Sequence, residues 1–236
     1  MHEYLVDSWG TMYCKEHQGT YPSCTYCGRL VPPKQQERDV AGVEIRCPIC
    51  RTSAIETVDQ ARPIFSRLIQ WVNSQGLVYN NLHLSLELVD RQKLGRLITG
   101  RSGTAGIHSQ GVTLSTTHTQ NGKEIRTEVN GIAVLEGMPV LSFQGVTVHE
   151  LGHVWLIVHD IRDLPLAEEE GFCELLAHRY YIQLNTKESL YHARSIETNP
   201  NPIYGDGYRC VSAIVDPIGF NRFIATLQKT KKLPSL

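Results

Sequence analysis

The stretch His149-Glu150-Leu151-Gly152-His153, followed by Glu169-Glu170-Gly171-Phe172-Cys173-Glu174, decides how this chain is organised. Residues four apart in an α-helix project from one face, about 6 Å apart along the axis, so His149 and His153 can bind one zinc ion. Glu150 lies beside that face, where its carboxylate can reach a metal-bound water without being a ligand. The spacing therefore predicts metal-assisted hydrolysis.

Apolar residues on both sides of the histidine pair predict the helix that carries it. Thr147-Val148 precede the pair and residues 154–158 follow it, so one side of the helix can be buried while the other faces a cleft. A core helix with two surface histidines would show the same pattern. That alternative does not account for the cluster of carboxylates that follows.

A catalytic zinc usually has three protein ligands and an open position for water, so a third ligand is expected from a second helix. Residues 166–181 begin with carboxylates, which favour the positive N-terminal end of a helix. Glu174 lies one turn beyond Glu170 and shares its face. Glu174 is therefore our candidate for the carboxylate that accepts the second N–H of His149 or His153.

This combination resembles the gluzincin metallopeptidases, and especially their aminopeptidase branch. In that branch an Asn-Glu-Gly-Phe-Ala-like segment follows the HExxH helix, and its Glu binds zinc. The resemblance implies that Glu170, in Glu170-Gly171-Phe172, is the third zinc ligand. Glu169 is the alternative.

Five of the seven cysteines fall within the first 50 residues, which predicts a zinc-binding module there. Cys24-x2-Cys27 and Cys47-x2-Cys50 have the spacing of a complete four-thiolate structural site, which can hold a core-poor segment together. Disulfide pairing of these four cysteines, or four separate buried thiols, is the alternative. The sequence thus predicts one catalytic and at least one structural zinc.

The remaining cysteines have less defined roles. Cys14-x2-His17 has the spacing of half of a second structural site, to which His2 could add one ligand, and no further cysteine pair precedes it. Cys173 and Cys210 are expected to be buried and to behave as small hydrophobic residues.

Composition limits the classes of protein to consider. With 236 residues, 41% of them hydrophobic, the chain can bury a sizeable core in one or two domains. The net charge of −1 gives no electrostatic argument for binding nucleic acid or an anionic membrane. The sequence shows neither a membrane-spanning apolar run nor a signal peptide at its start. We therefore expect a cytoplasmic protein that binds neither nucleic acid nor membrane.

Local patterns predict the other elements. Apolar spacing predicts a helix within residues 54–76, and alternation predicts a strand at 82–89. Residues 112–135 read as a hairpin around Asn121-Gly122, and Pro139 can open the histidine helix. Residues 101–106 are rich in Gly, Ser and Thr, and we expect them to form a loop.

These elements predict an α+β fold in two parts. A small zinc-ribbon or LIM-like module occupies residues 1–53. A gluzincin-like metallopeptidase domain with a small antiparallel sheet and a helical active-site half occupies residues 54–236. Within the sheet, Ile132 to Leu135 is our candidate for an edge strand that holds an extended substrate, although an ordinary core strand would look the same.

Further motifs extend over most of the chain, from about Cys14 to Pro234. They are Asp59-Gln-Ala-Arg-Pro-Ile-Phe65, His149-Glu150-x-x-His153-x-Trp155, Glu169-Glu170-Gly171-x-Cys173, Leu176-Ala177-His178 and Tyr204-Gly205-Asp206-Gly207-Tyr208-Arg209. Together they resemble the plant LIM-containing, ubiquitin-activated peptidases that limit organ growth. The resemblance implies a zinc peptidase that cleaves protein or peptide substrates and has ubiquitin or a ubiquitin-like protein as activator. Plant members also carry ubiquitin-interacting helices and a complete LIM region, whereas this chain begins partway through such a region.

The expected mechanism needs a proton acceptor and an oxyanion donor. Glu150 would take the proton of the zinc-activated water as general base. Tyr204, Tyr208, Arg209 and His178 are candidates for the donor. Tyr208 is preferred because it sits in a motif whose glycines allow close backbone approach, although a tyrosine tied into the core fits as well. Asp206 could position Arg209 or a histidine.

Two other functions fit the same residues. The chain could be a zinc-stapled protein-interaction module with an inactive peptidase domain, or a zinc amidohydrolase that acts on a non-protein substrate.

Overall fold

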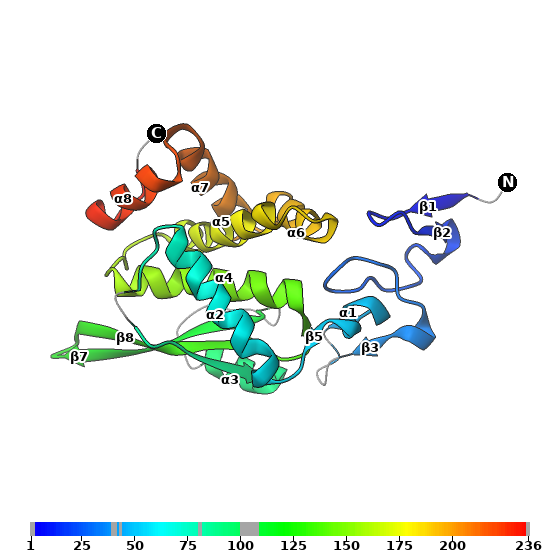
Figure 1. Ribbon diagram of the computed structural model, residues 1–236, viewed down its shortest axis with the longest axis horizontal. Coiled ribbons are helices and arrows are strands. Elements are labelled where there is room, and N and C mark those ends of the chain that lie inside the picture. The colour runs from blue at the N-terminus through cyan, green and yellow to red at the C-terminus, as the bar shows by residue number, and fades with distance from the viewer. Residues whose placement is uncertain (1–2, 39–41, 43, 80–81, 100–108, 235–236) are drawn as a thin grey trace.

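The computed structural model describes residues 3–38, 42, 44–79, 82–99 and 109–234 (Figure 1). The fold mixes helices with small sheets, as the predicted α+β class requires. The predictions for His2 and for the loop at residues 101–106 lie outside the described residues.

The N-terminal part contains only short elements. They are β1 (Tyr4–Val6), β2 (Met12–Cys14), β3 (Glu37–Arg38), β4 (Ile45–Arg46) and α1 (Pro48–Thr52), with 3-10 turns at Lys15–His17 and Pro33–Gln35. β1 pairs with β2, and β3 pairs with β4, both antiparallel. Such short ladders bury few apolar side chains, so a metal held by its cysteines would add to the stability of this part.

A three-stranded sheet forms the floor of the second part. It has the order β6 (Ser85–Val89), β8 (Lys123–Leu135) and β7 (Gly111–Gln120). Asn121 and Gly122 both have positive φ, +51° and +74°, which is the backbone of the predicted two-residue hairpin.

The sheet is mixed and not antiparallel, so that prediction was wrong. β6 runs parallel to β8, because the chain crosses over through α3 (Arg91–Thr99) and the hairpin before it reaches β8. Alternation in residues 82–89 predicts a strand but carries no information about its direction in the sheet.

Helices cover the sheet and build the rest of the molecule. After the short pair β5 (Ala54–Ile55) and β9 (Met138–Pro139), the main helices are α2 (Val58–Ser74), α4 (Val140–Val158), α5 (Leu166–Leu184), α6 (Lys187–Glu197), α7 (Gly205–Ile218) and α8 (Phe220–Thr230). α2 begins with a capping box between Thr57 and Gln60. α4 begins directly after Pro139, as predicted.

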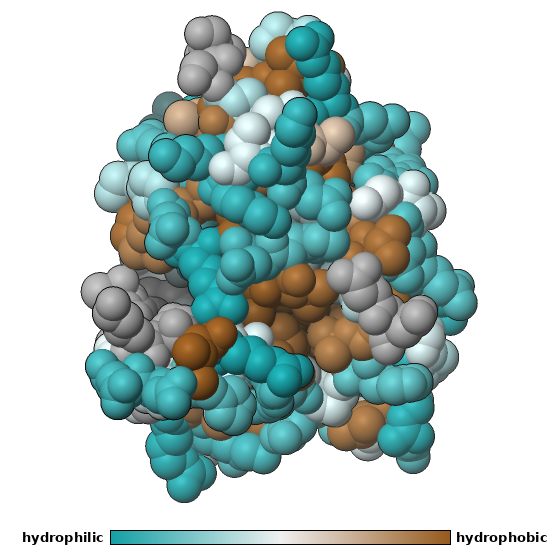
Figure 2. Space-filling model, turned by 90° about the vertical axis from the view of Figure 1, so that its left-hand side faces the viewer, coloured by the Kyte–Doolittle hydropathy of each residue, from teal (hydrophilic) through white to brown (hydrophobic). Residues whose placement is uncertain are grey.

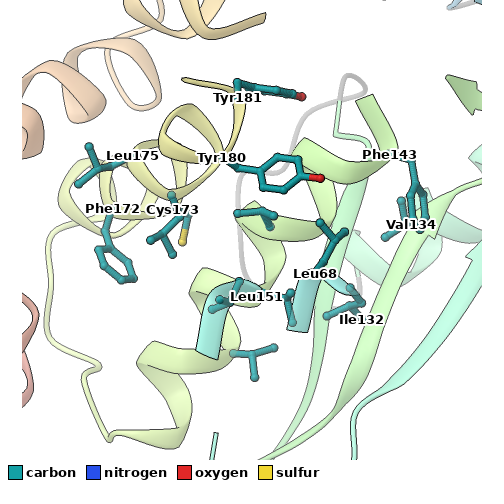
Figure 3. Close-up of a cluster of buried hydrophobic side chains, with 14 of the residues drawn as sticks. Leu68, Ile132, Val134, Phe143, Leu151, Phe172, Cys173, Leu175, Tyr180 and Tyr181 are labelled. Atoms are coloured by element: carbon teal, nitrogen blue, oxygen red, sulfur yellow. The ribbon is translucent and has the colours of Figure 1, made fainter. Parts of the chain in front are cut away.

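The core lies around α4, which is enclosed by the sheet, α2 and α5 (Figure 1). Figure 3 shows Leu151 of α4 among Leu68 from α2, Ile132 from β8 and Phe172 from α5, and each of these side chains is at most 2% exposed. Because three elements clamp α4, the one face that it leaves open is held in a fixed position.

Hydrophilic residues dominate the face of the molecule shown in Figure 2, with apolar residues gathered towards its centre. Among the described residues no single helix is both long and apolar enough to cross a bilayer. α7 and α8 reach that threshold only as a pair, and they are bent by 110° where they join.

Candidate metal centre and active site

Two imidazole nitrogens and one carboxylate oxygen converge on the open face of α4. His149 Nε2 lies 3.0 Å from Glu170 Oε2 and 3.3 Å from His153 Nε2. His153 Nε2 lies 3.4 Å from the same carboxylate oxygen. Ligand atoms bound at about 2.0–2.1 Å to a tetrahedral zinc lie about 3.3–3.4 Å from one another, so this donor set could hold zinc.

Two further carboxylates contact the outer nitrogens of the histidine rings. Glu174 Oε1 lies 3.2 Å from His149 Nδ1, which is the arrangement expected of Glu174. Glu169 Oε1 lies 2.9 Å from His153 Nδ1. Glu169 therefore faces the second nitrogen of His153 and not the point where the Nε2 atoms converge. Such contacts fix the tautomer and orientation of a metal-binding imidazole.

Neighbouring acidic groups raise the pKa of both histidines. Burial lowers the pKa of His149, but the hydrogen bonds that its ring donates to Glu170 and Glu174 outweigh this effect, and the net pKa lies well above the usual value. His153 behaves in the same way beside Cys173 and Glu169. The histidines in turn hold the pKa of Glu170 well below its usual value, although burial alone would raise it. This excess of negative charge favours a divalent cation.

Cys173 is the other candidate ligand near the histidine pair, since its thiol also lies within reach of both rings. The side chain is fully buried, as predicted, and its Sγ lies 2.9 Å from where a Cβ on Gly152 would stand. Burial raises the pKa of this thiol. Figure 3 shows the sulfur among apolar side chains. We favour Glu170, because one of its oxygens meets both Nε2 atoms.

Glu150 is held in place by the neighbouring strand. Its side chain is buried, and its Oε2 accepts a hydrogen bond from Thr113 Oγ1 at 2.8 Å. Gly111 on the same strand leaves room for this carboxylate, because a Cβ there would lie 2.9 Å from Glu150 Oε1. Sequence reasoning placed Thr113 in a strand but missed its contact with Glu150. The only available signal was that Gly111 and Thr113 share one face of that strand.

The strand at the edge of the sheet beside α4 is β7 and not Ile132 to Leu135, so that prediction was wrong. Residues 131–135 of β8 pair with β6 on one side and with residues 111–114 of β7 on the other. Because strands pair with it on both sides, this segment has no free edge to which a substrate backbone could bind. Among the described strands of this sheet, β6 and β7 each have a single partner. β7 is the one that contacts Glu150 of α4, so it is our candidate for pairing with a peptide.

Tyr204, and not the preferred Tyr208, stands next to the histidines. The ring centroid of Tyr204 lies 6.4 Å from that of His149. Burial, together with the charge of Glu170, raises the pKa of Tyr204 to about 12, so its hydroxyl keeps its proton at neutral pH. Tyr208 is buried against His178, with ring centroids 4.8 Å apart, and its acidic neighbours are Glu197 and Asp216.

The other two donor candidates have structural partners. His178 Nε2 lies 2.8 Å from a carboxylate oxygen of Glu197. Arg209 donates to the carbonyl oxygens of Glu197 and Asn199 at 2.9 and 3.0 Å, and it forms an ion pair with Asp206. Arg209 therefore ties α7 to the end of α6.

Two glycines of the predicted motifs allow α7 to pack closely against α5, the helix that carries Glu170. A Cβ on Gly171 of α5 would collide with the backbone of Gly207, and one on Gly207 would collide with the carbonyl of Ala167. The helices therefore cross in backbone contact, which only glycine permits. This crossing places Tyr204, at the start of α7, beside His149.

The four-cysteine cluster forms as predicted in the N-terminal part. Cys24, Cys27, Cys47 and Cys50 are all buried, and their sulfur atoms lie within 4.8 Å of one another. Cys27 Sγ and Cys47 Sγ are 3.6 Å apart, close to the spacing of about 3.8 Å expected for two thiolates on a tetrahedral zinc. The backbone N–H of Cys50 lies 3.4 Å from Cys47 Sγ. The cluster could hold a structural zinc.

The other cysteine predictions had different outcomes. No metal-capable group among the described residues includes Cys14 or His17, and the His17 ring stacks on Tyr21 instead. Cys210 is exposed and not buried, so that prediction was wrong. It lies on α7, whose apolar face is formed by residues such as Val211 and Ile214 and turns Cys210 outward.

A comparison with known proteins finds similarity in the part of the chain that carries the candidate metal site. Residues 90–193, which include the histidine pair and the acidic cluster, match the family model DA1-like, described as Protein DA1. Protein DA1 of Arabidopsis thaliana is 23% identical over 96% of this chain and 52% of its own length. The chain is similar to the DA1 proteins.

Other plant proteins match in the same way. The LIM domain-containing protein HDR3 of Oryza sativa subsp. japonica is 24% identical over 96% of this chain and 57% of its own. Protein DA1-related 1 of Arabidopsis thaliana is 24% identical over 96% and 51%. The chain thus spans about half the length of these relatives, and the resemblance to this plant family is confirmed. No solved structure matches.

Proposed function

We propose that the protein is a zinc-dependent peptidase of the gluzincin type, acting on protein or peptide substrates. The convergence of His149, His153 and Glu170 on one point carries this proposal, because their donor atoms have the mutual spacing of zinc ligands. A buried carboxylate, Glu150, and an edge strand beside the same helix supply the other parts that peptide hydrolysis needs.

The chain's own groups divide the work of hydrolysis. Zinc bound here would lower the pKa of a water and polarise the scissile carbonyl. Glu150 accepts the proton of the attacking water and returns it to the leaving amine, while the hydroxyl of Thr113 keeps its carboxylate in one orientation. Tyr204, still protonated at neutral pH, donates to the developing oxyanion.

The substrate would lie extended along β7. Pairing of a peptide backbone with an edge strand places its residues at regular spacing, and β7 passes directly over Glu150 through Gly111 and Thr113. Glu169 and Glu174 keep the two imidazole rings oriented through their Nδ1 atoms.

We further propose a structural zinc in the four-cysteine cluster, which makes residues 1–53 a LIM-like module. Four free thiols in one buried cluster suit a reducing compartment such as the cytoplasm. Activation by ubiquitin is proposed from the family resemblance alone, and peptide turnover with and without added ubiquitin tests it.

A Glu150→Gln variant tests the proposed function. We expect it to keep about two zincs per chain and to lose peptide turnover by roughly 100-fold or more, since the proton acceptor is removed and the ligands stay. Glu188→Gln, an exposed carboxylate in the first turn of α6, is the matched control and should keep full turnover. Turnover that survives Glu150→Gln would rule out this mechanism.

A further inference from the structure

A cavity of about 170 Å³ lies where three parts of the molecule meet. Its walls include Tyr26 from the four-cysteine module, Gln110 from the start of β7, Ser142 and Val146 from α4, and Tyr181 from α5. No part of the mechanism proposed above uses these side chains.

The cavity lies on the face of α4 that carries the metal ligands. Ser142 is seven residues before His149, which is two helical turns or about 10 Å along the same face. Val146 stands between them. A Cβ on Gly111 would lie 2.7 Å from Val146 Cγ1 and 2.9 Å from Glu150 Oε1, so the cavity wall and the proposed general base are neighbours.

α5 closes the cavity on the other side. The Tyr181 hydroxyl donates to the Leu141 carbonyl at 3.3 Å, while Glu170 of the same helix contacts His149. α4 and α5 therefore run antiparallel, and the metal site and the cavity lie along the same pair of helices. An extended peptide advances about 3.3 Å per residue, so a side chain within about three residues of the scissile bond can reach it.

The lining is polar but carries no charge among the described residues. Ser142 is only 5% exposed, and its hydroxyl has no hydrogen-bond partner in the described part of the chain. His192 stacks on Tyr181 with ring centroids 5.0 Å apart, and burial lowers its pKa to about 4, so it is neutral at pH 7. A charged side chain entering here would lose its hydration without a countercharge, whereas a neutral hydrogen-bonding group would satisfy Ser142.

The four-cysteine cluster builds one wall of the cavity. Thr25 and Tyr26 are the two residues between Cys24 and Cys27, and both line it. The backbone N–H of Ile45 donates to Thr25 Oγ1 at 2.9 Å, and the Tyr26 hydroxyl bonds the buried carboxylate of Glu44. The module therefore holds these two side chains in fixed positions.

We propose that this cavity is a specificity pocket that takes one uncharged, hydrogen-bonding side chain of the peptide substrate, such as Asn, Gln, Ser or Thr. The four-cysteine module supplies part of it, so this module helps to select the substrate. This inference rests on the proposed peptidase function.

A peptide library randomised on both sides of the scissile bond tests the pocket. With the zinc-loaded protein, one position should prefer uncharged polar residues over Asp, Glu, Lys and Arg by roughly tenfold or more. Ser142→Ala should reduce the preference for hydrogen-bonding residues at that position. Ser195→Tyr, which narrows the rim, should abolish selection there and leave the other positions unchanged.

Ser66→Tyr is the matched control. Ser195 and Ser66 are both exposed helical serines whose hydroxyl donates to the carbonyl four residues earlier, at 2.9 and 3.1 Å, but Ser66 lies on α2. The cleavage profile of Ser66→Tyr should equal that of the wild type.

The outcomes separate the two proposals. Cleavage by the wild type with a profile that Ser142→Ala and Ser195→Tyr leave unchanged would overturn the pocket and leave the peptidase intact. A wild type that cleaves no peptide would overturn the peptidase and the pocket with it. A second readout is binding of a selected peptide to the Glu150→Gln protein, measured by fluorescence anisotropy. Replacing the pocket residue of that peptide by Asp should weaken binding about tenfold, and Ser195→Tyr should remove the difference.

Discussion

Glu169 and Glu174 show how one acidic cluster divides into separate roles. Both lie on α5 within a turn of Glu170, yet each meets the outer nitrogen of a different imidazole. The spacing from Glu170 placed Glu174 on the histidine side of α5. It could not assign Glu169, because the side on which a neighbouring carboxylate reaches depends on how α4 and α5 cross.

Removing one of these outer carboxylates should weaken metal binding without abolishing it. We expect Glu174→Gln to lower the zinc affinity of the histidine site roughly 10- to 100-fold, because His149 loses the group that fixes its ring. Competition with a chelator of known affinity measures this change. Glu168→Gln, in the first turn of the same helix, should change it less than about twofold. An equal loss in both variants would contradict a specific role for Glu174.

The raised pKa values of His149 and His153 predict how stability depends on pH when the histidine site is free of metal. A histidine whose pKa is higher in the folded than in the unfolded state stabilises the fold below its unfolded value of about 6.5, and this contribution is lost as pH rises through the folded value. Protein with zinc in the four-cysteine cluster and none in the histidine site should therefore lose stability as pH rises above about 6.5.

Urea unfolding between pH 6 and pH 9 measures this effect. Saturating zinc should remove the decline, because metal replaces the two protons. Glu170→Gln should weaken the decline, since this carboxylate raises both pKa values. A stability of the one-zinc protein that rises across this range would contradict the assigned contacts.

At the scale of elements, the crossing of α5 and α7 decides which tyrosine reaches the histidines. The glycine spacing in the late motif predicted a close backbone approach, and Gly171 and Gly207 do meet. The glycine spacing did not predict which side chain of α7 would lie beside the histidines. The geometry places Tyr204, the N-cap of α7, beside His149 and turns Tyr208 into the core.

Gly207→Ala should force α5 and α7 apart. We expect a loss of about 2 kcal/mol or more in the free energy of unfolding, because the added methyl group meets backbone and not a movable side chain. Thermal unfolding should show this as a fall in Tm of roughly 4–8 °C.

Gly95→Ala is the matched control for this crossing. Gly95 lies inside α3 with nothing within 4 Å of its Cβ position, so alanine should raise stability by about 0.5–1 kcal/mol. Equal effects of the two substitutions would contradict the backbone contact.

At the scale of the whole molecule, the four-cysteine module and the part that carries the histidine pair are joined by buried polar contacts. Glu44 bonds the Tyr26 hydroxyl, pairs with Arg91 at the start of α3, and accepts from Gln110 Nε2 at 3.0 Å. Arg91 also donates to the Ser109 carbonyl at 2.7 Å. These contacts fix the start of β7, which carries Gly111 and Thr113 to Glu150.

Glu44→Gln should weaken both stability and catalysis. The side chains of Glu44 and Arg91 are only 5% and 9% exposed, so removing the carboxylate leaves a buried guanidinium charge and costs about 3 kcal/mol. Urea unfolding and peptide turnover measure the two effects.

The exposed ion pair between Glu87 and Lys93 supplies the control for this prediction. Its two atoms lie 2.8 Å apart, and Glu87→Gln should change stability by less than about 1 kcal/mol and leave turnover unchanged. If Glu44→Gln behaves like Glu87→Gln, the contact between the two parts does not position β7.

Local sequence patterns predicted the parts of the molecule and missed how they are joined. The cysteine pairs, the histidine helix and the Asn121-Gly122 hairpin follow from short-range spacing, and the structure contains all three. The direction of β6, the edge position of β7 and the contacts of Glu44 depend on residues far apart in the sequence. No periodicity within a single segment encodes such pairings, so they could not be predicted.

We propose that His149, His153 and Glu170 hold a zinc separate from the one in the four-cysteine cluster. Metal content per chain tests it most directly, in the wild type and in a His149→Ala/His153→Ala variant purified without added metal. We expect about two zincs in the wild type and about one in the variant. An equal metal content in the two proteins would contradict it.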